Sequence, residues 1–211
     1  ANNSSVLYGK NIDVIYSGIE TSIFEIRERK FSRHKLGIKY ENEIILIGAS
    51  NLDEKHKGLD FIINTINNIK KDIIVMTFGQ VNQLEKKINK KVIQLGYIKN
   101  QDLLVDVYNS SNVFLSPSLV EAFGKTVCEA QSCGIPAICF SDTGPEDIIE
   151  HKKTGYLSKY LDYNDLLCGL EYCLENKFSK KYIRNRSINK FDINETCNKY
   201  LNIYQNLIFK K

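Results

Sequence analysis

Short apolar runs alternate with amphipathic stretches through most of the chain, and this alternation constrains the fold more than any other feature. The apolar runs are three to four residues long and end at turn-forming residues, as is typical of strands buried on both faces of a sheet. They comprise residues 44–47, 73–76, 92–95, 113–115 and 137–140. Strands alternating with helices predict parallel βαβ units with right-handed crossovers. We therefore expect an α/β fold with a doubly wound parallel, Rossmann-like sheet.

The stretches between these runs carry the helical signals. Residues 58–69 place apolar side chains at helical spacing, and residues 27–36 read as a helix that ends at Gly37. A further helix is expected to present one face made of Leu103, Leu104, Val107 and Tyr108. Further helices are expected as follows: 81–90, 144–150 with Thr143 or Asp142 as its cap, 161–174 and 193–209. Residues 12–16 alternate like a short strand. With 211 residues the chain is long enough for one sizeable core, so 1–211 is predicted to be a single domain.

Residues 112–136 read as strand, loop and helix, with the sequence NVFLSPSLVEAFGKTVCEAQSCGIP. If the helix begins near Gly124, its first N–H groups are unpaired and form a positive end suited to phosphate. Glycine there lets a ligand approach the backbone closely. Glu121 lies in the loop, and Glu129 lies more than a turn inside the helix, beside such an anion, where its carboxylate would suit two hydroxyl groups.

The run Glu121-Ala122-Phe123-Gly124, followed by Glu129, resembles the E-x7-E signature of the family 4 retaining glycosyltransferases. Those enzymes have the GT-B fold, in which two Rossmann-like domains face each other. Segments beginning at residues 58, 96, 116 and 155 also resemble the C-terminal, donor-binding half of that fold, and the resemblance covers nearly the whole chain. It implies that residues 1–20 form the interdomain hinge region, that residues 191–211 contain the closing helix, and that an N-terminal acceptor domain, absent here, would precede residue 1.

The resemblance implies two catalytic residues. Lys57 would contact the donor pyrophosphate and stabilise the departing nucleotide, and Glu121 would lie against the donor sugar without acting as a nucleophile. A lysine beside a helix N-terminus favours a bound anion, because the helix dipole there disfavours a cation. The residues alone favour the alternative that Lys57 is a solvent-exposed lysine in a run with Lys55 and His56, and the resemblance reverses that preference.

The same resemblance implies a set of donor-binding residues: Asn51, Gly79, Tyr97, Ile98, Ser118, Phe123, Gly124, Lys125, Thr126 and Glu129. The backbone at 97–98 would meet the nucleobase, the amides of 123–126 the phosphates, and Glu129 the ribose hydroxyls. Tyr97 could instead pack at a strand end, and Glu129 could be a helix acid favoured by the dipole. Asn51 stands where the family usually has an arginine, and its amide cannot supply a charged, bidentate fork. Either Lys55 or His56 substitutes for that arginine, or donor affinity is weaker.

Other classes of site are disfavoured. The three histidines lack ligand spacing, so no metal is expected, and neither a dinucleotide-binding glycine motif nor a P-loop is present, so no cofactor is expected. A net charge of +4 is too slight for a nucleic-acid binder. No run of about 18 apolar residues predicts a membrane span. The six cysteines form no C-x-x-C pair and are expected to be buried thiols.

The expected function is retaining transfer of a hexosyl group from a nucleotide diphosphate sugar, UDP-sugar rather than GDP-sugar, to a glycan or lipid-linked acceptor. Without its acceptor domain the chain is expected to bind nucleotide but to be inactive. Two alternatives stay open: a nucleotide-sugar 2-epimerase of GT-B fold, and a noncatalytic interaction module. The bias toward asparagine, lysine and isoleucine suggests a bacterial source. It associates the protein with polysaccharide biosynthesis in the cytoplasm, with the full-length protein peripheral to the inner face of the membrane.

Overall fold

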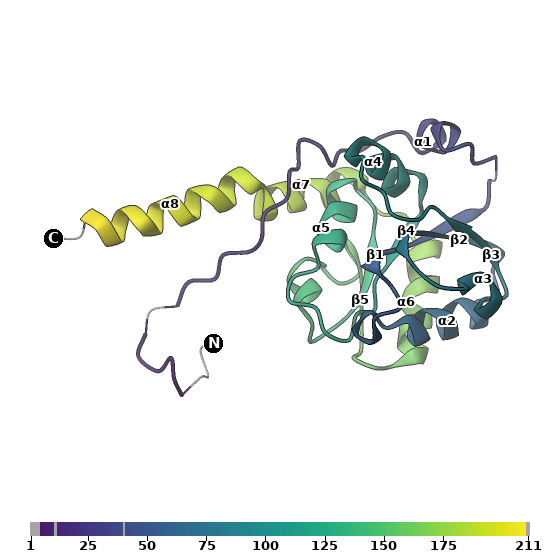
Figure 1. Cartoon of the computed structure of the whole chain (residues 1–211), viewed down its shortest axis with the longest axis horizontal. Helices are drawn as coiled ribbons and strands as arrows, with labels where there is room; N and C mark the ends of the chain where they lie inside the picture. The colour runs from purple at the N-terminus through teal and green to yellow at the C-terminus, as the bar shows by residue number, and fades with distance from the viewer. Residues whose placement is uncertain (1–4, 11, 40, 210–211) are drawn as a thin grey trace.

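Six parallel strands form one sheet in the part of the chain that the structure describes (Figure 1). The structure is a computed structural model, and it describes residues 5–10, 12–39 and 41–209. The strand order is β3-β2-β1-β4-β5-β6. The strands are β1 (Glu43–Asn51), β2 (Ile73–Gln80), β3 (Lys91–Gln94), β4 (Val113–Leu115), β5 (Ala137–Phe140) and β6 (Gly155–Ser158). The predicted doubly wound parallel sheet is confirmed.

Helices cover both faces of the sheet (Figure 1). Alternate residues of β1 serve the two cores, because successive strand side chains point to opposite faces: Ile44 and Leu46 join one cluster, Ile45 and Ile47 the other. One face carries α2 (Leu59–Asn68), α3 (Leu84–Lys87) and α6 (Tyr163–Glu175). The other carries α4 (Gln101–Ser110), α5 (Lys125–Ser132) and α7 (Lys180–Phe191), with α1 (Arg29–Lys35) packed on α4.

The strand order reverses between β1 and β4. The chain runs outward from β1 through β2 to β3, then crosses back and runs outward from β4 through β5 to β6. Such a switch point opens a crevice at the carboxyl ends of the central strands, where ligands of doubly wound proteins bind.

Three expected elements differ from the structure. The helix expected at 81–90 is a single turn, α3 (Leu84–Lys87), and Leu84 is its one buried residue. Residues 12–16 form no strand, because no strand of the described sheet lies beside them; only Ile19 pairs nearby, in an isolated bridge to Asp192. The expected helix at 144–150 is a 3-10 turn, η2 (Gly144–Asp147), entered at Thr143, whose hydroxyl donates to the Phe140 carbonyl rather than capping the turn.

Two elements were not predicted from the sequence. Strand β6 has only four residues, and α7 has the strongly charged sequence KKYIRNRSINKF. The helix buries only Ile183, Ser187 and Phe191, which lie one turn apart on a single face, so its apolar stripe is too narrow for the periodicity to stand out.

The helix α8 (Ile193–Phe209) has the predicted bounds and extends away from the sheet (Figure 1). Apolar side chains along it, among them Tyr204, Leu207 and Phe209, are exposed. The expectation of buried cysteines is wrong at two positions: Cys168 and Cys197 are exposed, since they lie on the outward faces of α6 and α8.

Candidate active site

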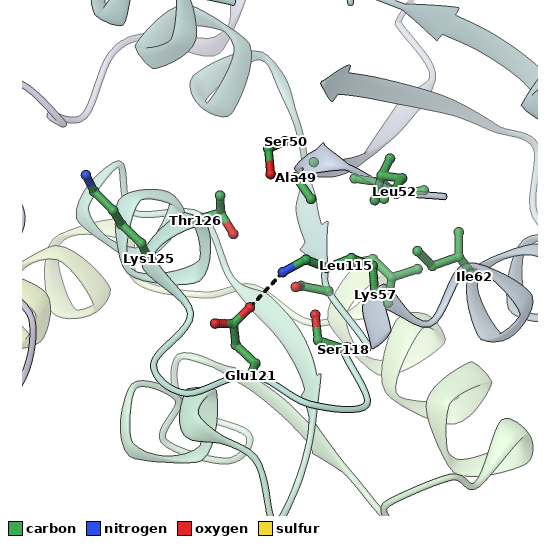
Figure 2. A pocket seen from close by; sticks show the side chains of 13 residues that line it. Ala49, Ser50, Leu52, Lys57, Ile62, Leu115, Ser118, Glu121, Lys125 and Thr126 are labelled. Carbon is green, nitrogen blue, oxygen red and sulfur yellow. Dashed lines mark hydrogen bonds and ion pairs between the residues drawn. The ribbon is translucent and has the colours of Figure 1, made fainter. Parts of the chain in front are cut away.

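A cavity of about 210 Å³ lies at the switch point, at the carboxyl ends of β1 and β4 (Figure 2). Its walls come from residues 47–50 and 115–118, from the start of α2, and from the first residues of α5. The sequence predicts that the loops after β2 and β3 converge here as well. In the structure they do not line this cavity, because β2 and β3 lie on the far side of β1 from β4.

Lys57 and Glu121 form an ion pair inside the cavity, with Nζ 3.0 Å from Oε2 (Figure 2). Lys57 ends the 3-10 turn η1 (Lys55–Lys57), and Gly58 follows with φ +71°. A β-carbon at Gly58 would lie 2.0 Å from the Pro117 carbonyl oxygen, so only glycine permits this approach. The two loops therefore press together, and the contact brings Lys57 to Glu121 across 64 positions of sequence.

The loop that carries Glu121 packs against η2 and is hydrogen-bonded to it. The Gly144 N–H donates to the Glu121 carbonyl at 2.8 Å. A β-carbon at Gly144 would lie 2.3 Å from the Ala122 carbonyl oxygen, and one at Gly124 would lie 2.7 Å from the Pro145 ring. This close packing fixes the position of the Glu121 carboxylate relative to the start of α5.

The N-terminus of α5 faces the cavity through Lys125 and Thr126, as the sequence predicted. Gly124 precedes the helix with φ +95° and has no side chain to cap it. Within the described part of the chain, the N–H groups of residues 125–127 donate no hydrogen bond. Unpaired amides and the helix dipole make this end positive. Together with Lys57, it can bind an anion such as a phosphate.

Glu129 lies one turn further along α5 and is buried, 7% exposed. The Tyr108 hydroxyl, on α4, donates to Glu129 Oε2 at 2.9 Å. Burial raises the pKa of Glu129, and the Tyr108 hydrogen bond and the charge of Lys125 act in the opposite direction. The carboxylate does not line the cavity itself. Sequence reasoning missed Tyr108, because its only signal was a place on the apolar face of a helix.

Three further residues expected at the site lie outside the cavity walls. The Asn51 carboxamide oxygen accepts from the Asp53 N–H at 3.0 Å, within its own loop. The Tyr97 side chain is 71% exposed at the end of β3, and Ile98 packs against the core. Their assigned roles stay predictions.

Gly79 and Phe123 lie outside the cavity walls and pack against neighbouring segments. Ser118 is buried and lines the cavity. The Gly79 N–H donates to the Gly96 carbonyl at 2.8 Å, and a β-carbon there would lie 1.6 Å from the carbonyl oxygen of Ala49. The Phe123 ring packs against Tyr16 and Phe191, at centroid distances of 6.3 and 5.5 Å. Phe123 can therefore contribute its backbone to the site, but its ring faces the hinge region.

Residues 5–10, 12–39 and 41–209 contain no group of three or more histidine, cysteine or acidic side chains placed to hold a metal ion. No helix within those same ranges has both the length and the apolar character needed to cross a bilayer.

The sheet topology and the cavity define a doubly wound α/β domain with a crevice at its switch point. The chain belongs to the glycosyl transferases group 1, whose family model matches residues 28–190. The family resemblance drawn from the E-x7-E signature is thereby confirmed.

Known relatives cover nearly the whole chain. It is 28% identical over 212 residues to a probable sucrose-phosphate synthase of Thermosipho melanesiensis, covering 92% of this chain and 47% of that protein. Its fold matches a solved sucrose-phosphate synthase from Thermosynechococcus elongatus with a TM-score of 0.82 and 21% identity, over 94% of this chain and 53% of the other. It also matches Anabaena HepE in complex with UDP and glucose, with a TM-score of 0.77 and 17% identity, over 92% and 56%. The chain thus spans about half the length of these relatives.

Proposed function

We propose that this chain is the donor-binding domain of a retaining glycosyltransferase that transfers a hexosyl group from a nucleotide diphosphate sugar to a glycan or lipid-linked acceptor. The observation that carries the proposal is the Lys57–Glu121 ion pair, which lies in a cavity bordered by the unpaired amides of α5. Family membership supports the reaction class, and the E-x7-E signature supports retention of configuration.

In this proposal the donor pyrophosphate lies between Lys57 and the first turn of α5. The ammonium group and the amides stabilise the negative charge that develops on the departing nucleotide, and they are already in place before the reaction. No metal ion is required for this step, because the protein supplies the positive charge. Glu121 holds Lys57 in position and lies against the sugar. Glu129, fixed by Tyr108, takes the ribose hydroxyls once the donor is bound.

UDP is the proposed nucleotide, since the structurally similar HepE was solved with UDP and glucose. The acceptor would bind to a further domain of the full-length protein, which we place in the cytoplasm at the inner face of the membrane. The chain alone should therefore bind the donor without appreciable turnover.

Calorimetric titration of the chain with UDP and with GDP tests the proposal. We expect saturable binding of UDP, weaker binding of GDP, and loss of binding in Glu129→Ala. A folded chain that binds neither nucleotide would contradict the donor-site assignment and favour a noncatalytic module. Robust transferase activity of the chain alone would contradict the proposed need for a second domain.

A further inference from the structure

Cationic side chains gather at the amino-terminal edge of the sheet, opposite the edge that holds the candidate active site. Two cavities there, of about 310 and 570 Å³, share Arg29 and Asn112 in their walls. The smaller cavity also contains Lys177 and Lys180, and no acidic residue lines it. Asn112 and Pro136 immediately precede β4 and β5, so this cavity lies at the starts of two central strands.

These cations have no counter-charge bound to them. Among the residues that the structure describes, buried Arg29 Nε has no hydrogen-bond partner, and neither Arg29, Lys177 nor Lys180 makes an ion pair. The charge of Glu43 acts on Arg29, but the Glu43 carboxylate is paired with Lys71 at 2.8 Å. A buried polar group without a partner points to a missing ion or water.

Burial and mutual repulsion both act on this pair of cations. Burial, followed by the charge of Arg29, lowers the pKa of Lys180. Burial also lowers the pKa of Arg29, although Glu43 opposes the shift. Two like charges held in a partly desolvated cavity are unfavourable unless an anion lies between them.

The N-terminus of α7 and the side-chain amide of Asn112 also favour a bound anion. Lys180 is the first residue of α7, a helix of 12 residues with no acidic side chain in its first turn. Its dipole disfavours a lysine at this end but favours an anion. The side-chain oxygen of Asn112, Oδ1, already accepts from the Ile44 N–H at 3.0 Å and from the Arg33 guanidinium at 3.1 Å. Its amide nitrogen, which can only donate, makes no hydrogen bond within the described residues.

We propose that Arg29, Asn112, Lys177 and Lys180 form a second ligand site, the basic pocket, which binds a phosphate group. Arginine and lysine supply charge-assisted donors to phosphate oxygens. Pro136, Leu174 and Phe178 give the same cavity an apolar wall for the body that carries the phosphate. The phosphate belongs either to a soluble phosphorylated molecule or to a lipid headgroup. The sheet separates this pocket from the candidate active site, so both can be occupied at once.

Calorimetric titration with inorganic phosphate tests the basic pocket in a Lys57→Gln background, which weakens phosphate binding at the other site. We expect saturable binding that falls at least tenfold when Arg29→Gln or Lys180→Gln is added and that persists with Lys180→Arg. Lys86→Gln, at an exposed lysine on α3, is the matched control and should change nothing. Circular dichroism confirms that each variant is folded.

Sedimentation with vesicles distinguishes the two sources of phosphate. Binding to phosphatidylglycerol vesicles but not to phosphatidylcholine vesicles, lost in Lys180→Gln, would identify a lipid headgroup. Binding of free phosphate without vesicle binding would identify a soluble ligand. The proposal is overturned if neither probe binds, or if Lys180→Gln and Lys86→Gln behave alike.

Discussion

At the residue scale, the proposed chemistry depends on Lys57, because its side chain pairs with Glu121 in the cavity that the first residues of α5 also line. We expect Lys57→Gln to weaken UDP binding about tenfold or more, the usual loss when a charge-assisted hydrogen bond to phosphate is removed. Calorimetric titration with UDP measures this loss of affinity. Lys55→Gln, two positions earlier on the exposed side of η1, is the matched control. Equal losses in both variants would show that net charge, and not this site, governs affinity.

Tyr108 is the second residue whose role can be isolated. Its hydroxyl is the one hydrogen-bond donor recorded for the Glu129 carboxylate in the described structure, and both groups are buried. Tyr108→Phe should lower the free energy of unfolding at pH 7 by about 1–3 kcal/mol, since it leaves a buried carboxylate without its partner. Urea denaturation measures this change.

A double-mutant cycle provides the control for Tyr108. In a Glu129→Ala background the Tyr108 hydroxyl has no carboxylate to donate to, so Tyr108→Phe should change the free energy of unfolding little there. If the substitution costs as much with Glu129 absent as with it present, the hydrogen bond does not stabilise the fold, and the positioning role of Tyr108 fails.

At the element scale, the loop contact around Gly58 decides whether the site exists. Gly58→Ala strains a residue at φ +71° and drives a β-carbon into the Pro117 carbonyl, so we expect a loss well above 1 kcal/mol in the free energy of unfolding, together with weaker UDP binding. Gly37→Ala is the matched control: its φ is +66°, but no atom lies within 4 Å of the new β-carbon. It should show only the backbone strain, about 1 kcal/mol. Equal losses of unfolding free energy in the two variants would show that the contact between the new β-carbon and the Pro117 carbonyl does not contribute.

At the scale of the whole molecule, Asp192 connects the segment around Thr21 to the start of α8. Its carboxylate accepts from the Thr21 hydroxyl and from the Asn194 N–H, the latter at 2.9 Å, so that it caps α8. These bonds, that of Thr21 first, lower the pKa of Asp192. A lowered pKa means that the stabilisation is present above the unfolded value, about pH 4, and is lost as pH falls through the folded value.

Asp192→Ala should therefore reduce protection of the first α8 amides at pH 7 by about 1 kcal/mol, the usual worth of a helix cap. Hydrogen exchange at several pH values measures this difference. The gap between the native chain and the variant should narrow as pH falls below about 4. A gap that stays constant down to pH 3 would mean that the charge of Asp192 does not contribute.

The sequence by itself determined the parallel, doubly wound architecture and the loop-to-helix geometry at the start of α5. Both rest on local properties: the length and periodicity of apolar runs, and glycines at places where the backbone needs positive φ. Lys57 and Glu121 line one cavity, because the carboxyl ends of parallel strands meet at one edge of a sheet, and Gly124 directly precedes α5; their roles in binding stay predictions.

Only the tertiary structure decided which distant side chains became partners. It joined Tyr108 to Glu129, turned the Phe123 ring toward Tyr16, and gathered Arg29 and Lys180 around one cavity. It also recruited α7 with three buried side chains and β6 with four residues. No local pattern encodes such pairings, because they depend on how separately formed elements pack, and packing is set by the shape and burial of the whole core.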